Sequence, residues 1–230
     1  MKNVVIICNG LFPKKEYPLD MIRKADYVVC CDGALTKYLK LSDDMGGRLP
    51  DMIIGDMDSL TPNVLTRLLG KMDPGEKDIL LSRMMHIEEQ ENNDQTKAFD
   101  YAIKHFKDIG DIHIIGATGL REDHTIGNMS LLMEYARKYD LDALGISVDM
   151  VSDYSTIFAI TDTTSIQVGE GRQMSIFSPD NSLRIKSEGL VWPTDAVIFD
   201  NWWKASLNRS SNDTVTLHFN HRSMALIVID

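Results

Sequence analysis

Two aspartates separated by a single residue give this sequence its clearest sign of chemistry. Asp56 and Asp58 follow the apolar run Met52–Ile54, and residues two apart in an extended chain share one face. Carboxylates held side by side repel one another unless a cation lies between them, and an oxygen-rich site of this kind suits Mg²⁺. The alternative is a polar turn in which one carboxylate caps a helix that begins near Thr61. We favour the metal site.

A further carboxylate ends another apolar run. Asp32 follows Tyr27–Cys31, and Gly33 after it permits a tight turn into a helix. Open α/β sheets bind their ligands beyond the carboxyl ends of the strands, but helix N-caps also favour aspartate. A ligand-binding role and a capping role for Asp32 therefore both stay open.

A polar cluster at residues 89–98 contains Asp94 and, one helical turn later, Lys97. Asp94 is suited to cap the helix that follows. A lysine near a helix N-terminus is unfavourable for the helix dipole, so a bound anion such as a phosphate would account for Lys97. An exposed lysine that points into solvent is the ordinary alternative.

A glycine-containing turn at residues 116–119 follows the apolar run Ile112–Ile115 and leads into a predicted helix. Backbone N–H groups of such a turn can bind phosphate, and Arg121 adds a fixed, bidentate donor. The candidate residues of this segment are Gly119, Arg121, Asp123, His124 and Asn128. A structural, hydrogen-bonded histidine is the alternative for His124.

Short runs rich in Val and Ile alternate with helical patterns over the first two thirds of the chain. The predicted strands are Val4–Cys8, Tyr27–Cys31, Met52–Ile54 and Ile112–Ile115. The predicted helices are Ala34–Leu41, Pro62–Leu69, Thr96–Phe106 and Asp123–Tyr139. Strands that alternate with helices indicate a mainly parallel α/β sheet, whose strand ends would position the acidic residues.

From about Ser155 the pattern changes to short alternating runs separated by turns, among them residues 165–168, 174–177, 215–219 and 225–229. Such runs predict a small antiparallel β-sandwich. The expected fold is α/β, with an N-terminal, mainly parallel α/β domain at residues 1–155 and a C-terminal β-sandwich domain at residues 156–230. We expect Trp202 and Trp203 to pack at a β-surface or a subunit contact rather than to bind substrate.

Charge and cysteine content limit the classes of partner. Lys plus Arg number 24 and Asp plus Glu number 34, which gives a net charge of −10. A field of that sign repels nucleic acid and anionic membrane surfaces, so neither is an expected partner. Cys8, Cys30 and Cys31 match no disulfide or zinc pattern, and the N-terminal apolar run is too short for a membrane span. We expect a cytoplasmic protein with reduced, buried thiols.

The sequence has no Walker A loop, so a nucleotide bound here would depend on Mg²⁺ held by carboxylates. A nucleophile elbow and an HExxH motif are also absent, which excludes the common serine hydrolase and zinc protease classes.

Taken together, the motifs resemble those of the thiamine pyrophosphokinase family. In order along residues 9–128 they are Asp32-Gly33, Gly55-Asp56-x-Asp58-Ser59, Gln90-x-x-x-Asp94-x-x-Lys97-Ala98 and Gly-x-x-Gly-x-Arg121-x-Asp123-His124-x-x-x-Asn128. Looser matches in the β-rich part are Gly189-Leu190-x-Trp192 and Ser211-Asn212. The resemblance implies transfer of a pyrophosphoryl group from Mg·ATP to the hydroxyl of thiamine, with release of AMP. It also implies a homodimer with the thiamine site near the subunit interface.

The same resemblance implies roles for individual residues. The implied metal ligands are Asp56, Asp58 and Asp94. The implied catalytic residues are Asp56, Asp94, Lys97, Arg121 and Asp123. The implied nucleotide-binding residues are Asp32, Gly33, Ser59, Lys97, Gly119, Arg121, His124 and Asn128. The implied thiamine-binding residues are Gln90, Trp192, Ser211 and Asn212, with Trp192 stacking on the cationic heterocycle.

The chain departs from the family pattern in two places. Glu91 and Asn93 stand where the family usually has Asp and Thr, and Val191 stands where Lys is common, with Pro193 two residues later. Two other functions compete, a Mg-dependent nucleotide pyrophosphohydrolase and a non-catalytic thiamine or nucleotide sensor. Trp192 argues against the first, because water needs no aromatic pocket for a cation. The full set of charged residues argues against the second.

Overall fold

The computed structural model describes residues 1–230. Its contacts divide the chain into a first unit, residues 1–128 with 151–153, and a second unit, residues 129–150 with 154–230. The division passes through helix α6 (Glu122–Tyr139). The predicted domain boundary after residue 155 therefore stays a prediction.

A parallel sheet forms the centre of the first unit. Its strands are β1 (Lys2–Ile7), β2 (Tyr27–Cys31), β3 (Met52–Gly55), β4 (Met84–His86) and β5 (Ile109–Ile115). They lie in the order β4-β3-β2-β1-β5, and each neighbouring pair is parallel. The predicted parallel sheet is confirmed. Strand β4 was not predicted, because its three residues are too few to show a period of two.

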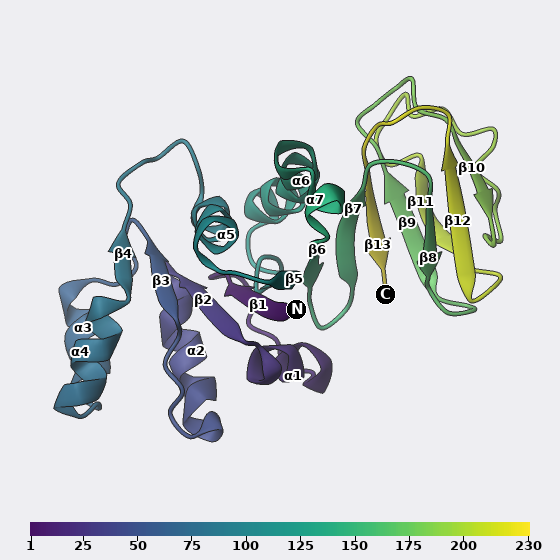
Figure 1. The fold of residues 1–230 in the computed structure, drawn as a ribbon. Helices are drawn as coiled ribbons and strands as arrows, with labels where there is room; N and C mark the ends of the chain where they lie inside the picture. Colours follow the sequence, from purple (N-terminus) through teal and green to yellow (C-terminus); the bar gives the residue numbers. More distant parts are fainter. The chain divides into compact units, whose positions relative to one another are not determined.

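Helices cover both faces of this sheet (Figure 1). On one face, the core includes Ile22, Tyr38 and Leu80, each with no exposed surface. These residues come from α1 (Glu16–Lys24), α2 (Leu35–Ser42) and α4 (Pro74–Ser82). On the other face, α5 (Asp94–His105) lies against β1, β2 and β3. The remaining helical segments are α3 (Pro62–Leu69) and the 3₁₀ turns η1 (Asp32–Ala34) and η2 (Asp43–Met45).

The start of α3 decides one alternative left open by the sequence. The hydroxyl of Thr61 accepts a hydrogen bond from the Val64 N–H at 3.4 Å, and Pro62 occupies the first turn. Both are common features of a helix start. Because Thr61 supplies the cap, neither Asp56 nor Asp58 is needed there.

The second unit contains two antiparallel sheets and completes the mixed α/β fold. One sheet has β7 (Thr156–Ile160), β13 (Ala225–Ile229), β9 (Gln173–Phe177) and β11 (Ala205–Arg209), in that order. The other has β10 (Ile185–Glu188), β12 (Thr214–Phe219) and β8 (Thr164–Gln167). Residues before them form α7 (Leu141–Leu144) and β6 (Ser147–Val151), which is next to β7 in the strand order. The predicted β-sandwich is confirmed.

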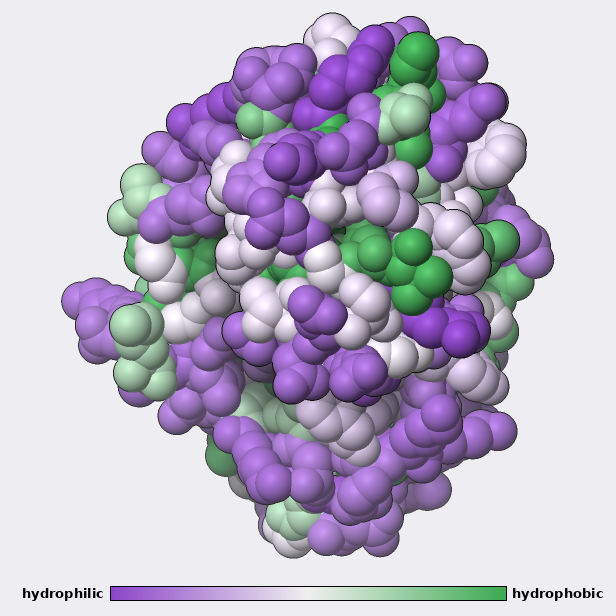
Figure 2. Space-filling view, turned by 90° about the vertical axis from the view of Figure 1, so that its right-hand side faces the viewer, coloured by the Kyte–Doolittle hydropathy of each residue, from purple (hydrophilic) through white to green (hydrophobic).

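The two antiparallel sheets share one apolar core. Met174, Ile176, Leu217 and Ile227 are among its members, and none is more than 1% exposed. Alternate residues of these strands point outward, and the face drawn in Figure 2 is accordingly mostly hydrophilic. None of the helices is long and apolar enough to pass through a bilayer.

Candidate active site

Three carboxylates meet at the carboxyl edge of the parallel sheet. Asp32 follows β2, Asp56 follows β3, and Asp94 is the first residue of α5. One carboxylate oxygen from each lies within 4.8 Å of the others. We call these three residues the carboxylate triad. Hard oxygen donors at this spacing are the ligands that Mg²⁺ prefers.

Asp32 supplies the strongest sign that the triad is built for a cation. Its side chain is 3% exposed, and its Oδ2 accepts a hydrogen bond from the Ser59 N–H at 2.8 Å. Its Oδ1 is buried and has no hydrogen-bond partner. A buried acceptor left unpaired costs about 1–3 kcal/mol, and a divalent cation shared with Asp56 and Asp94 would remove that cost. The residues present therefore fit a metal ion.

Gly55 allows the triad to close. A Cβ atom at this position would lie 2.7 Å from Asp32 Cβ and 3.1 Å from Asp94 Oδ2. Real Cβ atoms essentially never approach as closely as the first of these distances. Only a glycine at the end of β3 lets Asp32 and Asp94 approach each other across the strand end.

Asp58 lies outside the triad. Its carboxylate does not belong to the cluster formed by Asp32, Asp56 and Asp94, and its side chain is exposed. Its backbone N–H donates a hydrogen bond to Asp56 Oδ1 at 3.2 Å. The prediction that Asp56 and Asp58 share one face depended on an extended chain between them. Met57 between them has a φ of 63°, in the left-handed region, and this turn ends the period of two. The structure thus brings Asp32 to Asp56 and Asp94 in place of Asp58.

Lys97 is buried beside the triad. It is 6% exposed, and its ammonium lies 3.8 Å from Asp94 Oδ1 and donates to the Ile87 carbonyl at 3.1 Å. The alternative of a lysine that points into solvent is wrong. A cation at the start of α5 is tolerated because it faces a carboxylate. Lys97 also offers a positive charge to an anion held at the triad.

The pKa of Asp94 is raised to about 6, mainly because the carboxyl is buried; the Lys97 ammonium opposes this shift, and the charges of Asp56 and Asp32 add to it. A metal ion must displace the proton from this carboxyl below about pH 6. We therefore expect the affinity for Mn²⁺ to fall about tenfold for each pH unit below 6. Isothermal titration at about pH 7.5 and about pH 5 would measure this, and Asp94→Asn should abolish the difference.

The same raised pKa acts in the opposite direction on the metal-free fold. Between the ordinary pKa of 3.8 and the folded value of about 6, the folded protein binds the Asp94 proton more tightly than the unfolded chain. The contribution of Asp94 to the free energy of unfolding therefore rises as the pH falls through this window. Thermal unfolding of metal-free wild type, relative to Asp94→Asn, should show that rise. An equal pH dependence in both proteins would contradict it.

A pocket of about 350 Å³ adjoins the triad through Asp94. We call it the glycine-turn pocket. Its lining includes the predicted site residues Ser59, Asp94, Arg121, His124 and Asn128, together with Asn9, Gly10, Asn93, Gln95 and Ala117. Gly119 lies in the turn that borders it, at a φ of 88°. Gly33 is buried beside it, and a Cβ there would lie 2.3 Å from the amide nitrogen of Asn9.

Arg121, which lines this pocket, forms a bidentate pair with Asp123. Nε and one terminal nitrogen of Arg121 donate to the two oxygens of Asp123, at 3.1 and 2.5 Å. Both side chains are largely exposed. The hydrogen bond from Arg121 holds the pKa of Asp123 below its usual range. A lowered pKa makes Asp123 a weaker proton acceptor, which argues against its use as a general base.

Sequence reasoning missed the residues that follow β1. Asn9 and Gly10 line the glycine-turn pocket, and Lys37 donates to their carbonyls at 2.8 and 2.7 Å. Partial burial lowers the pKa of Lys37. The signal was present, because Asn9 and Gly10 end an apolar run in the same way as Asp32 and Gly33 do.

The candidate thiamine-binding residues of the second unit lie on two adjacent segments. The Ser211 N–H donates to the Gly189 carbonyl at 2.8 Å, and Leu190 forms a β-bridge with Ser210. Trp192 is 56% exposed. The side chains of Ser211 and Asn212 are exposed as well. In the first unit, Gln90 Nε2 lies 3.5 Å from Asp56 Oδ2.

Asn208 holds the backbone of Trp192 and was not predicted. Its side-chain amide donates to the Trp192 carbonyl at 2.6 Å, and its Oδ1 accepts from the Trp192 N–H at 3.2 Å. Asn208 is 7% exposed. The backbone is thus fixed while the indole ring stays open to solvent, as a stacking platform requires. Trp202 instead lies against Phe177 of β9, with 5.2 Å between ring centroids.

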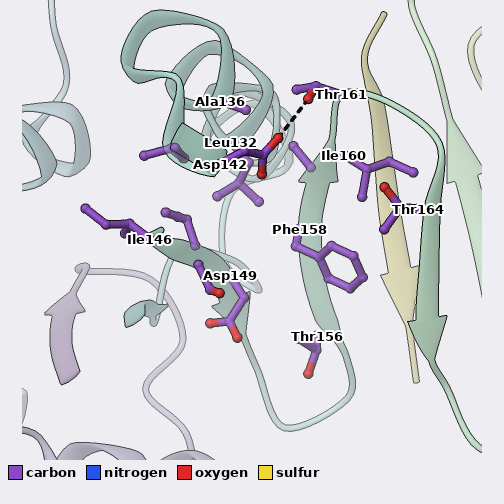
Figure 3. Close-up of a pocket in the computed structure, with 14 residues that line it drawn as sticks. Leu132, Ala136, Asp142, Ile146, Asp149, Thr156, Phe158, Ile160, Thr161 and Thr164 are labelled. Carbon is purple, nitrogen blue, oxygen red and sulfur yellow. Dashed lines mark hydrogen bonds between the residues drawn. The ribbon is translucent and has the colours of Figure 1, made fainter. Parts of the chain in front are cut away.

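A second pocket, of about 410 Å³, lies wholly within the second unit. Figure 3 shows its lining from α6, β6 and β7, with Phe158 and the carboxylates of Asp142 and Asp149. Asp142 accepts a hydrogen bond from the Thr161 hydroxyl at 3.2 Å. None of the predicted site residues lines this pocket, so the proposed chemistry does not involve it.

Two models of one protein family match this chain. The family model described as "Thiamin pyrophosphokinase, catalytic domain" matches residues 19–143, and "Thiamin pyrophosphokinase, substrate-binding domain" matches residues 156–226. No curated protein matches the chain in sequence.

Solved structures share the fold. Thiamine pyrophosphokinase from Bacillus subtilis is 18% identical, with a TM-score of 0.75 and coverage of 100% of this chain and 99% of that one. The Geobacillus thermodenitrificans protein is 19% identical, with a TM-score of 0.75 and coverage of 99% and 97%. Yeast thiamin pyrophosphokinase is 18% identical, with a TM-score of 0.70 and coverage of 100% and 86%. The two family models together span most of the sequence, and this chain is therefore an enzyme of the thiamin pyrophosphokinase family.

Proposed function

We propose that this enzyme transfers the pyrophosphoryl group of Mg·ATP to the hydroxyl of thiamine, giving thiamine diphosphate and AMP. The observation that carries the proposal is the carboxylate triad, with its unpaired Asp32 oxygen, beside the glycine-turn pocket. A triphosphate needs a site for a divalent cation next to donors for its phosphates, and these two features supply both.

In this proposal Asp32, Asp56 and Asp94 hold the Mg²⁺ ion. Bound Mg²⁺ would offset negative charge on the triphosphate oxygens. Lys97 adds a buried positive charge beside Asp94. Asp58, predicted as a ligand from the sequence, is exposed and outside the triad, and we assign it no direct coordination.

The glycine-turn pocket would bind the phosphates. Backbone N–H groups of the turn near Gly119, with Arg121 and His124 on the lining, are suited to contact them. The hydroxyl oxygen of thiamine forms a bond to the β-phosphorus, the bond from that phosphorus to the bridging oxygen of AMP breaks, and the hydroxyl proton passes to solvent or phosphate. Such a transfer depends on position and charge neutralisation more than on a strong base.

Trp192 would stack on the thiazolium ring of thiamine, because this ring is a cation and the exposed indole attracts cations to its face. Trp192→Ala should raise the KM for thiamine about tenfold and leave the KM for ATP unchanged, since a cation–π contact is worth about 1–2 kcal/mol. Trp203→Ala is the matched control, because Trp203 is similarly exposed, at 51%, and is not predicted to bind substrate. Equal effects of the two substitutions on the KM for thiamine would show that Trp192 does not bind thiamine.

The test of the function is ³¹P NMR of the purified enzyme with ATP, Mg²⁺ and thiamine. Equal amounts of AMP and a new diphosphate ester would support the proposal. AMP with free pyrophosphate would identify a pyrophosphohydrolase. Unchanged ATP in folded protein would point to another acceptor alcohol or to a sensor. A homodimer and a cytoplasmic location remain predictions, and sedimentation would test the first.

A further inference from the structure

We infer that Asn128 is a positioning residue that holds Asp94 in the carboxylate triad, rather than a residue that contacts the nucleotide. The inference rests on the proposed function in so far as the triad binds the metal ion of that reaction. It concerns a single residue of α6 and its bonds to the start of α5.

Asn128 bonds to both sequence neighbours of Asp94. Its Oδ1 accepts a hydrogen bond from the Asn93 side-chain amide at 2.8 Å, and its main-chain carbonyl accepts one from the Gln95 side chain at 3.2 Å. The residues on either side of Asp94 are thus attached to one residue of another helix. We call these two bonds the Asn128 clamp.

The clamp has a fixed base. The Asn128 side-chain amide donates to the Ala117 carbonyl at 2.8 Å, in the turn after β5. Asn128 is 8% exposed, Ala117 4% and Gln95 3%. Hydrogen bonds in such buried surroundings hold their geometry well, because solvent cannot compete for the same groups. The Asn128 side chain thus uses its oxygen and one N–H of its amide within the protein, which fixes its orientation.

Asn93 carries the clamp into α5. Its Oδ1 accepts from the Thr96 N–H at 3.0 Å as the N-cap of the helix, while its amide group reaches Asn128. The amide thus performs two tasks at once, capping the helix and setting its distance from α6. Because Asp94 is the next residue, the bonds of Asn93 also hold the backbone of Asp94 in place.

Asn93→Ser separates the two tasks. Serine is a good N-cap, but its side chain is too short to keep the bond to Asn128. We expect this variant to bind Mn²⁺ about fivefold more weakly in isothermal titration of the substrate-free protein. The half-saturating Mg²⁺ concentration in the enzyme assay should rise by a similar factor, with the KM for thiamine unchanged. Asn92→Ser is the matched control, since Asn92 bonds to Glu89 and not to the clamp.

A double-mutant cycle tests the bond itself. Asn128→Leu should weaken Mn²⁺ binding more than Asn93→Ser does, because it also removes the bond to Ala117. If Asn93 acts through Asn128, adding Asn93→Ser to Asn128→Leu should cause no further loss. Additive losses would overturn the proposal. A lower Tm in Asn93→Ser with wild-type Mn²⁺ affinity would also overturn it, because that result describes a purely structural bond.

The outcome is independent of the reaction. If the wild type makes no thiamine diphosphate, but Asn93→Ser binds Mn²⁺ more weakly than the wild type does, the proposed function is wrong and the clamp is supported. If the wild type makes thiamine diphosphate, but Asn93→Ser binds Mn²⁺ as tightly as the wild type does, the proposed function is supported and the clamp is wrong. A wild type that binds no Mn²⁺ would remove the clamp as well, because no metal site would exist for it to position.

Discussion

Asp56→Ala should lower kcat about a thousandfold without unfolding the protein. Asp56 is one of the three carboxylates whose oxygens lie within 4.8 Å of one another. Its loss leaves two ligands to hold the cation that neutralises the triphosphate. Charge stabilisation by a metal ion is worth several kcal/mol, and about 4 kcal/mol corresponds to a thousandfold change in rate. Steady-state kinetics with saturating Mg²⁺ would measure the effect.

Two further substitutions make the result specific. Asp43→Ala removes an exposed acid of η2 and should leave kcat unchanged. Asp58→Ala should have a clearly smaller effect than Asp56→Ala, because Asp58 lies outside the triad. A near-normal rate for Asp56→Ala would refute the metal assignment, and equal losses for Asp56→Ala and Asp58→Ala would favour the ligand pair expected from the sequence.

Gly55→Ala should damage both stability and activity. The added methyl group would lie 2.7 Å from Asp32 Cβ and 3.1 Å from Asp94 Oδ2, so at least one of the two carboxylates must move. Overpacking of this kind costs about 2 kcal/mol, which lowers the Tm by about 6 °C in a chain of this size. We expect Mn²⁺ affinity to fall as well, since the triad cannot keep its spacing. Calorimetry and metal titration would measure the two effects.

Gly127→Ala is the control for this substitution. Gly127 lies inside α6, and a Cβ there would meet nothing within 4 Å. Alanine in a helix is about 1 kcal/mol more favourable than glycine, so this variant should be as stable as the wild type or more so. A Gly55→Ala protein with wild-type Tm and Mn²⁺ affinity would show that the triad does not need the close approach.

The sequence by itself determined the architecture and the edge at which chemistry occurs. The Val- and Ile-rich runs predicted β2 at the observed residues and β1, β3 and β5 to within a few, because buried parallel strands need continuous apolar side chains. The acidic and glycine residues at the strand ends then identified the ligand edge, since Asp32, Asp56 and Gly119 all follow strands. The change to alternating runs near Ser155 gave the antiparallel sandwich.

The tertiary structure alone decided which carboxylates meet. A period of two predicted that Asp56 and Asp58 share a face, but Met57 between them is in the left-handed region and Asp58 lies outside the triad. Strand pairing and α5 bring Asp32 and Asp94 to Asp56 instead. Burial, which raises the pKa of Asp94 and encloses Lys97, follows from the packing of α5 on the sheet. Spacing along the chain describes neighbours within one element, whereas an active site is assembled from residues that only the packing of several elements brings together.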